Sequence, residues 1–157
     1  MLTTLRIVHI LSAMVWVGGT IALVFVGVPV VRQLEGEARA QAMRMLGRRW
    51  RPLGWSSMAI AIFSGLWLTH LHGGFDSAAL SSEFDRTLMV KSILVALLVV
   101  GALFHDYVLG PRLQQELRTG DPRAPATRRR LIWVGWFTFA LTLAAPILGA
   151  ILISYLA

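Results

Sequence analysis

The sequence contains no cysteine and a single lysine, and charged residues make up only 15% of its 157 positions. Without cysteine the chain has neither disulfide bonds nor thiolate ligands for a metal. Hydrophobic residues, in contrast, make up 56% of the chain. This composition is too apolar for an ordinary soluble domain, and it predicts a protein that is embedded in the lipid bilayer.

Four long apolar runs give the predicted fold. They cover about residues 5–31, 53–71, 88–108 and 131–156. Each approaches or exceeds the ~20 residues that a helix needs to cross ~30 Å of hydrocarbon, where helices satisfy their own backbone groups. The first run is too long for a cleavable signal peptide, so we expect it to be a span. The predicted fold class is all-α, an integral membrane four-helix bundle that forms one domain over residues 1–157.

The arginines predict how the bundle is oriented. Two loops hold most of them: Arg32, Arg39, Arg44, Arg48, Arg49 and Arg51 in the first, and Arg112, Arg118, Arg123, Arg128, Arg129 and Arg130 in the third. The positive-inside rule places these loops in the cytoplasm, and both termini then lie on the outer (periplasmic) side of the inner membrane. Anionic lipid headgroups explain the net charge of +7 more simply than nucleic acid does. The lipid bilayer is therefore the expected partner, and nucleic acid is not.

Local signals predict where the helices begin, end and pack. Ser82 to Asp85 is a capping box for the third run, Gly110-Pro111 is predicted to end that run, and Arg51-Pro52 is predicted to begin the second. The segment 33–49 is predicted to be an amphipathic helix near the headgroups. One face of the last run carries small residues that favour close helix packing: Thr138, Thr142, Ala145 and Gly149. No internal repeat is evident.

Ionisable side chains inside the spans are the candidate functional residues, because they are costly in lipid. Successive spans alternate in direction, so His9, His70, His72 and Lys91 are expected at one level near the outer face. Trp16 lies within about 20° of His9 around the first helix, which predicts that His9 faces the bundle. His70 and His72 point about 160° apart, so one of them is expected to face His9, and the better embedded His70 is favoured.

Each of these residues also has a purely structural interpretation. The two later histidines would be wetted by headgroups, and Lys91 would extend its amine to the interface. His105 lies about 21 Å along the helix from Lys91 and on nearly the same face. It would be a second ligand, an exit point for ions or protons, or the cap of a helix C-terminus.

Three segments resemble the membrane module of the copper resistance D (CopD) family. They are HILSAMVWVGG at 9–19, GRRWRPLGWSSMAIAIFSGLWL at 47–68 and LMVKSILVALLVVGALFHDYVLGP at 88–111. The module is also similar to the four-helix, haem-containing protoporphyrinogen oxidases of the HemJ type. The first resemblance implies copper handling. The second implies haem b, with His9 and Lys91 matching the histidine and lysine that matter in the oxidases.

Two cofactors fit the outer site predicted from these residues. Copper would depend on the imidazoles of His9, His70 and His72, because cysteine is absent. Haem b would use His9 with His70 or His72 as axial ligands, Trp16 and Trp67 as walls, and Lys91 or Arg86 for its propionates. Which cofactor binds stays open.

The predicted function is membrane redox chemistry or metal handling by a CopD-like protein. One alternative is an enzyme that oxidises a porphyrinogen with haem and a membrane quinone. A second alternative is a non-catalytic assembly or interaction subunit, in which the polar residues only specify packing. Catalysis, a membrane redox partner and a homo-oligomer all stay open.

Overall fold

The computed structural model describes residues 2–71 and 82–155, and every regular element in these ranges is helical. The elements are α1 (Leu2–Ala22), the π-helix η1 (Leu23–Gly27), α2 (Val28–Arg32), α3 (Gly36–Leu71), α4 (Glu83–Leu103), the π-helix η2 (Phe104–Leu109), α5 (Gly110–Thr119) and α6 (Ala124–Ser154). The all-α prediction is confirmed.

Three continuous helical stretches within the described ranges are long and apolar enough to cross a membrane: Leu2–Arg32, Glu83–Thr119 and Ala124–Ser154. These correspond to the first, third and fourth predicted spans. The second, 53–71, forms the C-terminal half of α3. Serines, glycines, a threonine and His70 interrupt its apolar character, and α3 is not among the three. A crossing by α3 therefore stays a prediction.

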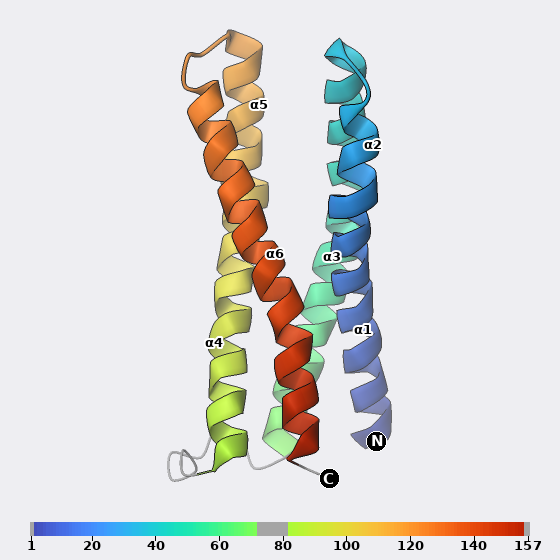
Figure 1. The fold of residues 1–157 in the computed structure, drawn as a ribbon. Coiled ribbons are helices and arrows are strands. Elements are labelled where there is room, and N and C mark those ends of the chain that lie inside the picture. Colours follow the sequence, from blue (N-terminus) through green and yellow to red (C-terminus); the bar gives the residue numbers. More distant parts are fainter. Residues whose placement is uncertain (1, 72–81, 156–157) are drawn as a thin grey trace. The chain divides into compact units, whose positions relative to one another are not determined.

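The chain divides into two compact units, Met1–Asp76 and Ser77–Ala157, and each is a helical hairpin (Figure 1). In unit 1, α1 with η1 and α2 runs antiparallel to α3 after a short turn that ends at Gly36, whose φ of 51° suits glycine. In unit 2, α4 with η2 and α5 runs antiparallel to α6 after a turn through Gly120, with φ of 66°. Each unit therefore brings the start of its first helix to the end of its last. The prediction of one domain concerns both units together and stays a prediction.

Two predicted helix boundaries are wrong. Gly110-Pro111 does not end the third helical run, because η2 carries it into α5 and on to Thr119. In this π-helix the amide of Gly110 donates to the carbonyl of His105, five residues back, and this wider turn accommodates the proline that follows. Arg51-Pro52 does not begin a helix either, since Pro52 lies inside α3. The Ser82 cap is confirmed, with the Asp85 amide donating to Ser82 Oγ at 3.1 Å.

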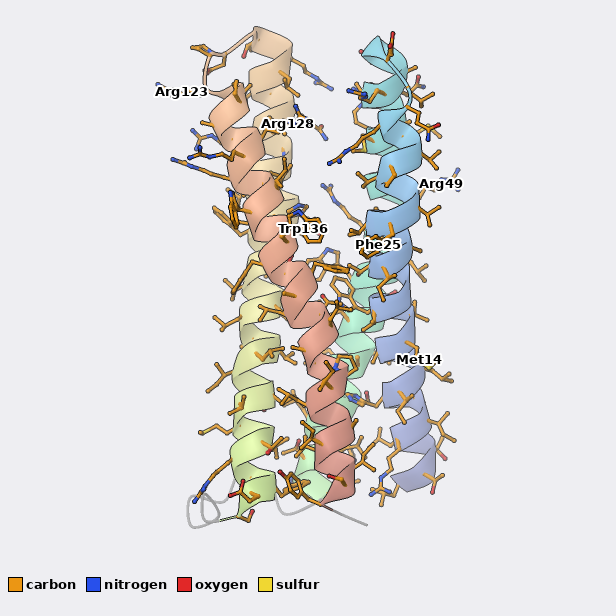
Figure 2. The ribbon with its side chains drawn as sticks, viewed as in Figure 1. Met14, Phe25, Arg49, Arg123, Arg128 and Trp136 are labelled. Carbon is orange, nitrogen blue, oxygen red and sulfur yellow. The ribbon has the colours of Figure 1, made fainter. Side chains whose placement is uncertain are left out.

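Large apolar side chains mostly lie on the outside of each hairpin, as expected for surfaces in contact with lipid. Figure 2 shows one of them, Met14, projecting outward from α1, and it is 62% exposed. The buried positions of α3 are instead Gly54, Ser57, Met58 and Ser64. Because these residues of α3 are mostly small, α1 and α3 can approach each other closely. A few larger polar side chains then fill the remaining space between the two helices. This close packing positions the candidate site.

Candidate functional site

His9 of α1 points into unit 1 and binds α3. Its Nδ1 lies 2.8 Å from the carbonyl oxygen of Ala61 and 3.2 Å from Ser64 Oγ. A carbonyl oxygen can only accept, so Nδ1 carries the hydrogen and donates it to Ala61. This tautomer puts the ring's lone pair on Nε2, which is the atom that would bind a metal. The predicted orientation of His9 toward a neighbouring helix is confirmed.

Gly65 makes the space that the imidazole of His9 occupies. A Cβ atom on Gly65 would lie 3.0 Å from Cε1 of His9 and 3.3 Å from its Nδ1. Ala61, Ser64 and Gly65 share one face of α3, because they are separated by three and four residues. The carbonyl of Ala61, the hydroxyl of Ser64 and the absence of a side chain at Gly65 together fix the position of the ring.

Trp16 continues the same face of α1 at about 10 Å from His9 along the helix. Its ring centroid lies 6.1 Å from that of Trp50 and 6.2 Å from that of Trp55. Trp50 in turn covers Gly19 and Gly54, where a Cβ atom would overlap its indole. The sequence reasoning did not identify Trp50 and Trp55 as partners of Trp16. The segment RRWRPLGW could have indicated this pairing, because its two tryptophans lie close to a glycine and are bulky enough to require space on a facing helix.

The other residues of unit 1 in the predicted outer site are Trp67, His70 and His72. Trp67 is 59% exposed, and His70 is exposed as well. His70 follows Gly65 by five residues and so points about 140° away from it around α3. His72 lies outside the described residues. The participation of Trp67, His70 and His72 in one site with His9 stays a prediction, and residues 2–71 and 82–155 contain no group of three or more His, Asp or Glu side chains arranged to hold a metal ion.

Lys91 occupies a comparable position in unit 2. It is half-buried, and its Nζ lies 3.1 Å from where a Cβ atom on Gly149 of α6 would be. Thr142, two turns earlier on the same face of α6, is only 1% exposed. The predicted small-residue face of α6 is therefore confirmed as its contact with α4. A meeting of Lys91 with His9 would join both units and stays a prediction.

His105 is the third histidine that the structure describes. It lies in η2, where its Nδ1 is 2.9 Å from Asp106 Oδ1, and its Nε2 lies 3.4 Å from a Cβ position on Gly135 of α6. Its interpretation as the cap of a helix C-terminus is wrong, because the helical run continues for fourteen residues to Thr119. Its possible roles as a ligand or as an exit point stay predictions.

Three of the ionisable side chains described between the helices share one packing feature. His9, Lys91 and His105 each lie over a glycine of the facing helix: Gly65, Gly149 and Gly135. Arrangements of this kind are typical of membrane helices, where small residues permit close approach and polar groups are turned away from lipid. The molecule is an all-α integral membrane protein with ionisable side chains held between its helices.

Comparisons with known proteins give its family. Residues 43–152 match the family model described as Copper resistance protein D (CopD), and residues 3–82 match that described as Predicted integral membrane protein (DUF2269). The chain belongs to the CopD family, and its first half also belongs to the DUF2269 family. The resemblance to CopD is confirmed, whereas the likeness to the oxidases stays a prediction.

A curated relative is the "Inner membrane protein YebZ" of Escherichia coli (strain K12). It is 30% identical over 131 residues, which are 83% of this chain and 40% of that protein. This chain therefore spans well under two thirds of the relative's length. No solved structure matches the chain.

Proposed function

We propose that this protein handles copper or carries out redox chemistry in the inner membrane, with His9 as the ligand of copper or of haem iron. The observation that carries the proposal is the hydrogen bond of 2.8 Å between Nδ1 of His9 and the carbonyl of Ala61. Metal-binding histidines commonly donate their second nitrogen to a carbonyl or carboxylate, which fixes the tautomer and turns the other nitrogen toward the metal.

The donors present determine how well each metal centre fits. Imidazole is a good ligand for both copper and iron. Unit 1 directs one imidazole between its described helices, and one axial ligand can be sufficient for haem, whereas copper without thiolates needs several imidazoles. In either case the metal would supply one-electron chemistry. The chain would hold the ligand in place through Ala61 and Ser64 and would exclude lipid with Trp16.

Purified protein with its bound metal tests the proposal directly. The protein is produced with iron and copper supplied, and its visible spectrum and its iron and copper contents are measured. A Soret band that disappears in His9→Ala identifies haem, and copper in a colourless protein that is lost in the same variant identifies copper. His105→Ala removes a histidine of unit 2, and metal that is kept in this variant but lost in His9→Ala assigns the ligand to His9 alone, whereas loss in both variants identifies His105 as a second ligand.

His70→Ala shows whether the exposed histidine of α3 is a second ligand. If the unaltered protein carries neither metal, or if His9→Ala retains it fully, the proposal is wrong. The alternative of a non-catalytic assembly or interaction subunit, in which the polar residues only specify packing, would then explain the half-buried His9.

The lack of cysteine makes the proposed orientation easy to test. In the proposed topology, the N-terminus and Ser82 face the periplasm, and the turn at Gly120 faces the cytoplasm. Single cysteines introduced as Thr3→Cys and Ser82→Cys should react with an impermeant maleimide in intact cells, whereas Gln114→Cys should react only after lysis. The reverse pattern would overturn the orientation.

A further inference from the structure

A basic groove runs along the N-terminal half of α3, outside the predicted span. Its volume is about 610 Å³, and six residues on one strip of the helix line it: Glu37, Gln41, Arg44, Met45, Arg48 and Arg49. Figure 2 shows Arg49 projecting from the surface of unit 1. The groove is a surface feature of a single helix and is separate from the packing around His9.

The charges in this groove are not balanced. Arg44 is paired with Glu37, with Nη2 2.6 Å from Oε1. Arg48 and Arg49 form no ion pair within the described part of the chain, and both are exposed. Glu37 lies about 16 Å along the helix from Arg48, so its carboxylate does not neutralise this end of the groove. Two adjacent guanidinium groups are therefore available to bind an anion.

The depth of the two arginines follows from the continuity of α3. The apolar run begins at Leu53, four and five residues after Arg49 and Arg48. At 1.5 Å per residue the arginines lie about 6–7 Å from that boundary. The headgroup layer of one leaflet is roughly 5–8 Å thick, so the predicted crossing by residues 53–71 would put both guanidinium groups at the level of the lipid phosphates. Met45, at 48% exposure, supplies an apolar edge beside them.

We propose that Arg48 and Arg49 form a binding site for the phosphodiester headgroup of an anionic phospholipid. Guanidinium groups bind phosphate oxygens in pairs through their planar N–H donors. The Arg44–Glu37 ion pair lies toward the other end of the groove. A lipid fits better than free phosphate, because the arginines lie one turn before exposed apolar residues that would contact its acyl chains.

Native mass spectrometry of the full-length protein tests the site. The protein is extracted from nanodiscs of phosphatidylcholine that contain a minority of phosphatidylglycerol, and the retained phosphatidylglycerol is counted. The double variant Arg48→Gln/Arg49→Gln should bind it roughly thirtyfold more weakly, because it removes two charge-assisted hydrogen-bond donors to the phosphate. Arg118→Gln/Arg130→Gln is the matched control, because it removes the same charge from exposed positions outside the groove.

Each other outcome also decides the question. An equal loss in both double variants would mean that net charge alone attracts the lipid, and an undiminished signal in the groove variant would exclude the site. Arg48→Lys/Arg49→Lys keeps both charges but removes the paired N–H donors, so it should restore only a small part of the binding, and full restoration would contradict recognition by the guanidinium groups. Displacement of phosphatidylglycerol by equimolar inorganic phosphate would overturn the assignment to a lipid.

Discussion

The two helical hairpins share one arrangement but fill it with different side chains. In each, an ionisable residue lies over a glycine of the facing helix, His9 over Gly65 and Lys91 over Gly149. In each, this residue is followed twenty positions later by a proline, Pro29 or Pro111, which is the second residue after a π-helix. No internal repeat is evident in the sequence, yet the two hairpins share these packing features.

The side chains packed between the helices are more rigid in unit 1 than in unit 2. In unit 1 the rings of Trp16, Trp50 and Trp55 pack against one another, and the imidazole of His9 has two hydrogen-bond partners. In unit 2 the methyl group of Thr138 lies over Gly101, and the group over Gly149 is the end of the flexible Lys91 side chain. Rigid rings cannot yield to an added atom, whereas a lysine chain can. Replacing the glycine that lies under the ionisable group should therefore cost more in unit 1, at Gly65, than in unit 2, at Gly149.

Gly19→Ala should have the largest effect. The added methyl group would overlap the indole of Trp50, which is itself packed against Gly54 and Trp16. Overpacking of this kind costs about 2–3 kcal/mol, more than the ~1 kcal/mol that alanine gains over glycine in helix propensity. The thermal midpoint in detergent, followed by tryptophan fluorescence, should fall clearly.

Gly18→Ala is the matched control for this change. It is the neighbouring position on α1, and a Cβ atom there meets nothing within 4 Å. Its midpoint should stay constant or rise slightly. Equal midpoints for the two variants would mean that Trp50 does not pack on Gly19.

Gly65→Ala should come next. The new methyl group would lie 3.0 Å from the ring of His9, which has to move away from Ala61 or push the helices apart. The expected cost in unfolding free energy is about 1 kcal/mol. If His9 is a metal ligand, affinity for the metal should also fall about tenfold, as it does when groups that orient a ligand are disturbed.

Metal titration and thermal unfolding separate the two consequences of Gly65→Ala. Gly47→Ala, on the same helix but with open space around it, should change neither. A lower midpoint with unchanged metal binding would support the packing of His9 against Gly65 but contradict the role of His9 as a ligand.

The charged pairs of the two hairpins extend the comparison. Glu116 in α5 is 6% exposed and accepts from Nε of Arg112 at 2.8 Å, whereas the side chain of Glu37 in unit 1 is 81% exposed. Glu116→Gln should lower the thermal midpoint, because it leaves Arg112 without its charged partner. Glu37→Gln should change stability by less than about 0.5 kcal/mol, as is usual for surface ion pairs. The order of the two midpoints checks the prediction, and a reversed order would contradict it.

The sequence predicted those features that depend on a single helix. The helical class, the Ser82 cap, the inward face of His9 and Trp16, and the small-residue face of α6 all follow from periodicity and local chemistry. They could be predicted because the rotation of 100° per residue is the same in every helix.

Features that depend on the register between helices could not be predicted in the same way. The pairing of Trp16 with Trp50 and Trp55 depends on how far α1 slides along α3, which no local pattern fixes. The choice of His70 rested on depth in the membrane, while the face of α3 that contacts His9 is set by Ala61, Ser64 and Gly65. Gly110-Pro111 was misleading for another reason, because the π-helix η2 lets the helical run continue where proline usually ends it.

Gly149→Ala should have the smallest effect and tests the comparison most directly. The added methyl group would lie 3.1 Å from Nζ of Lys91, nearly as close as the contact expected in Gly65→Ala. The lysine has four rotatable side-chain bonds and can withdraw its amine, so the expected cost is below about 0.5 kcal/mol. Thermal unfolding of Gly149→Ala and Gly65→Ala side by side measures the difference. A midpoint for Gly149→Ala as low as that for Gly65→Ala would mean that the amine of Lys91 is held as firmly as the imidazole, and that the hairpins share their rigidity as well as their design.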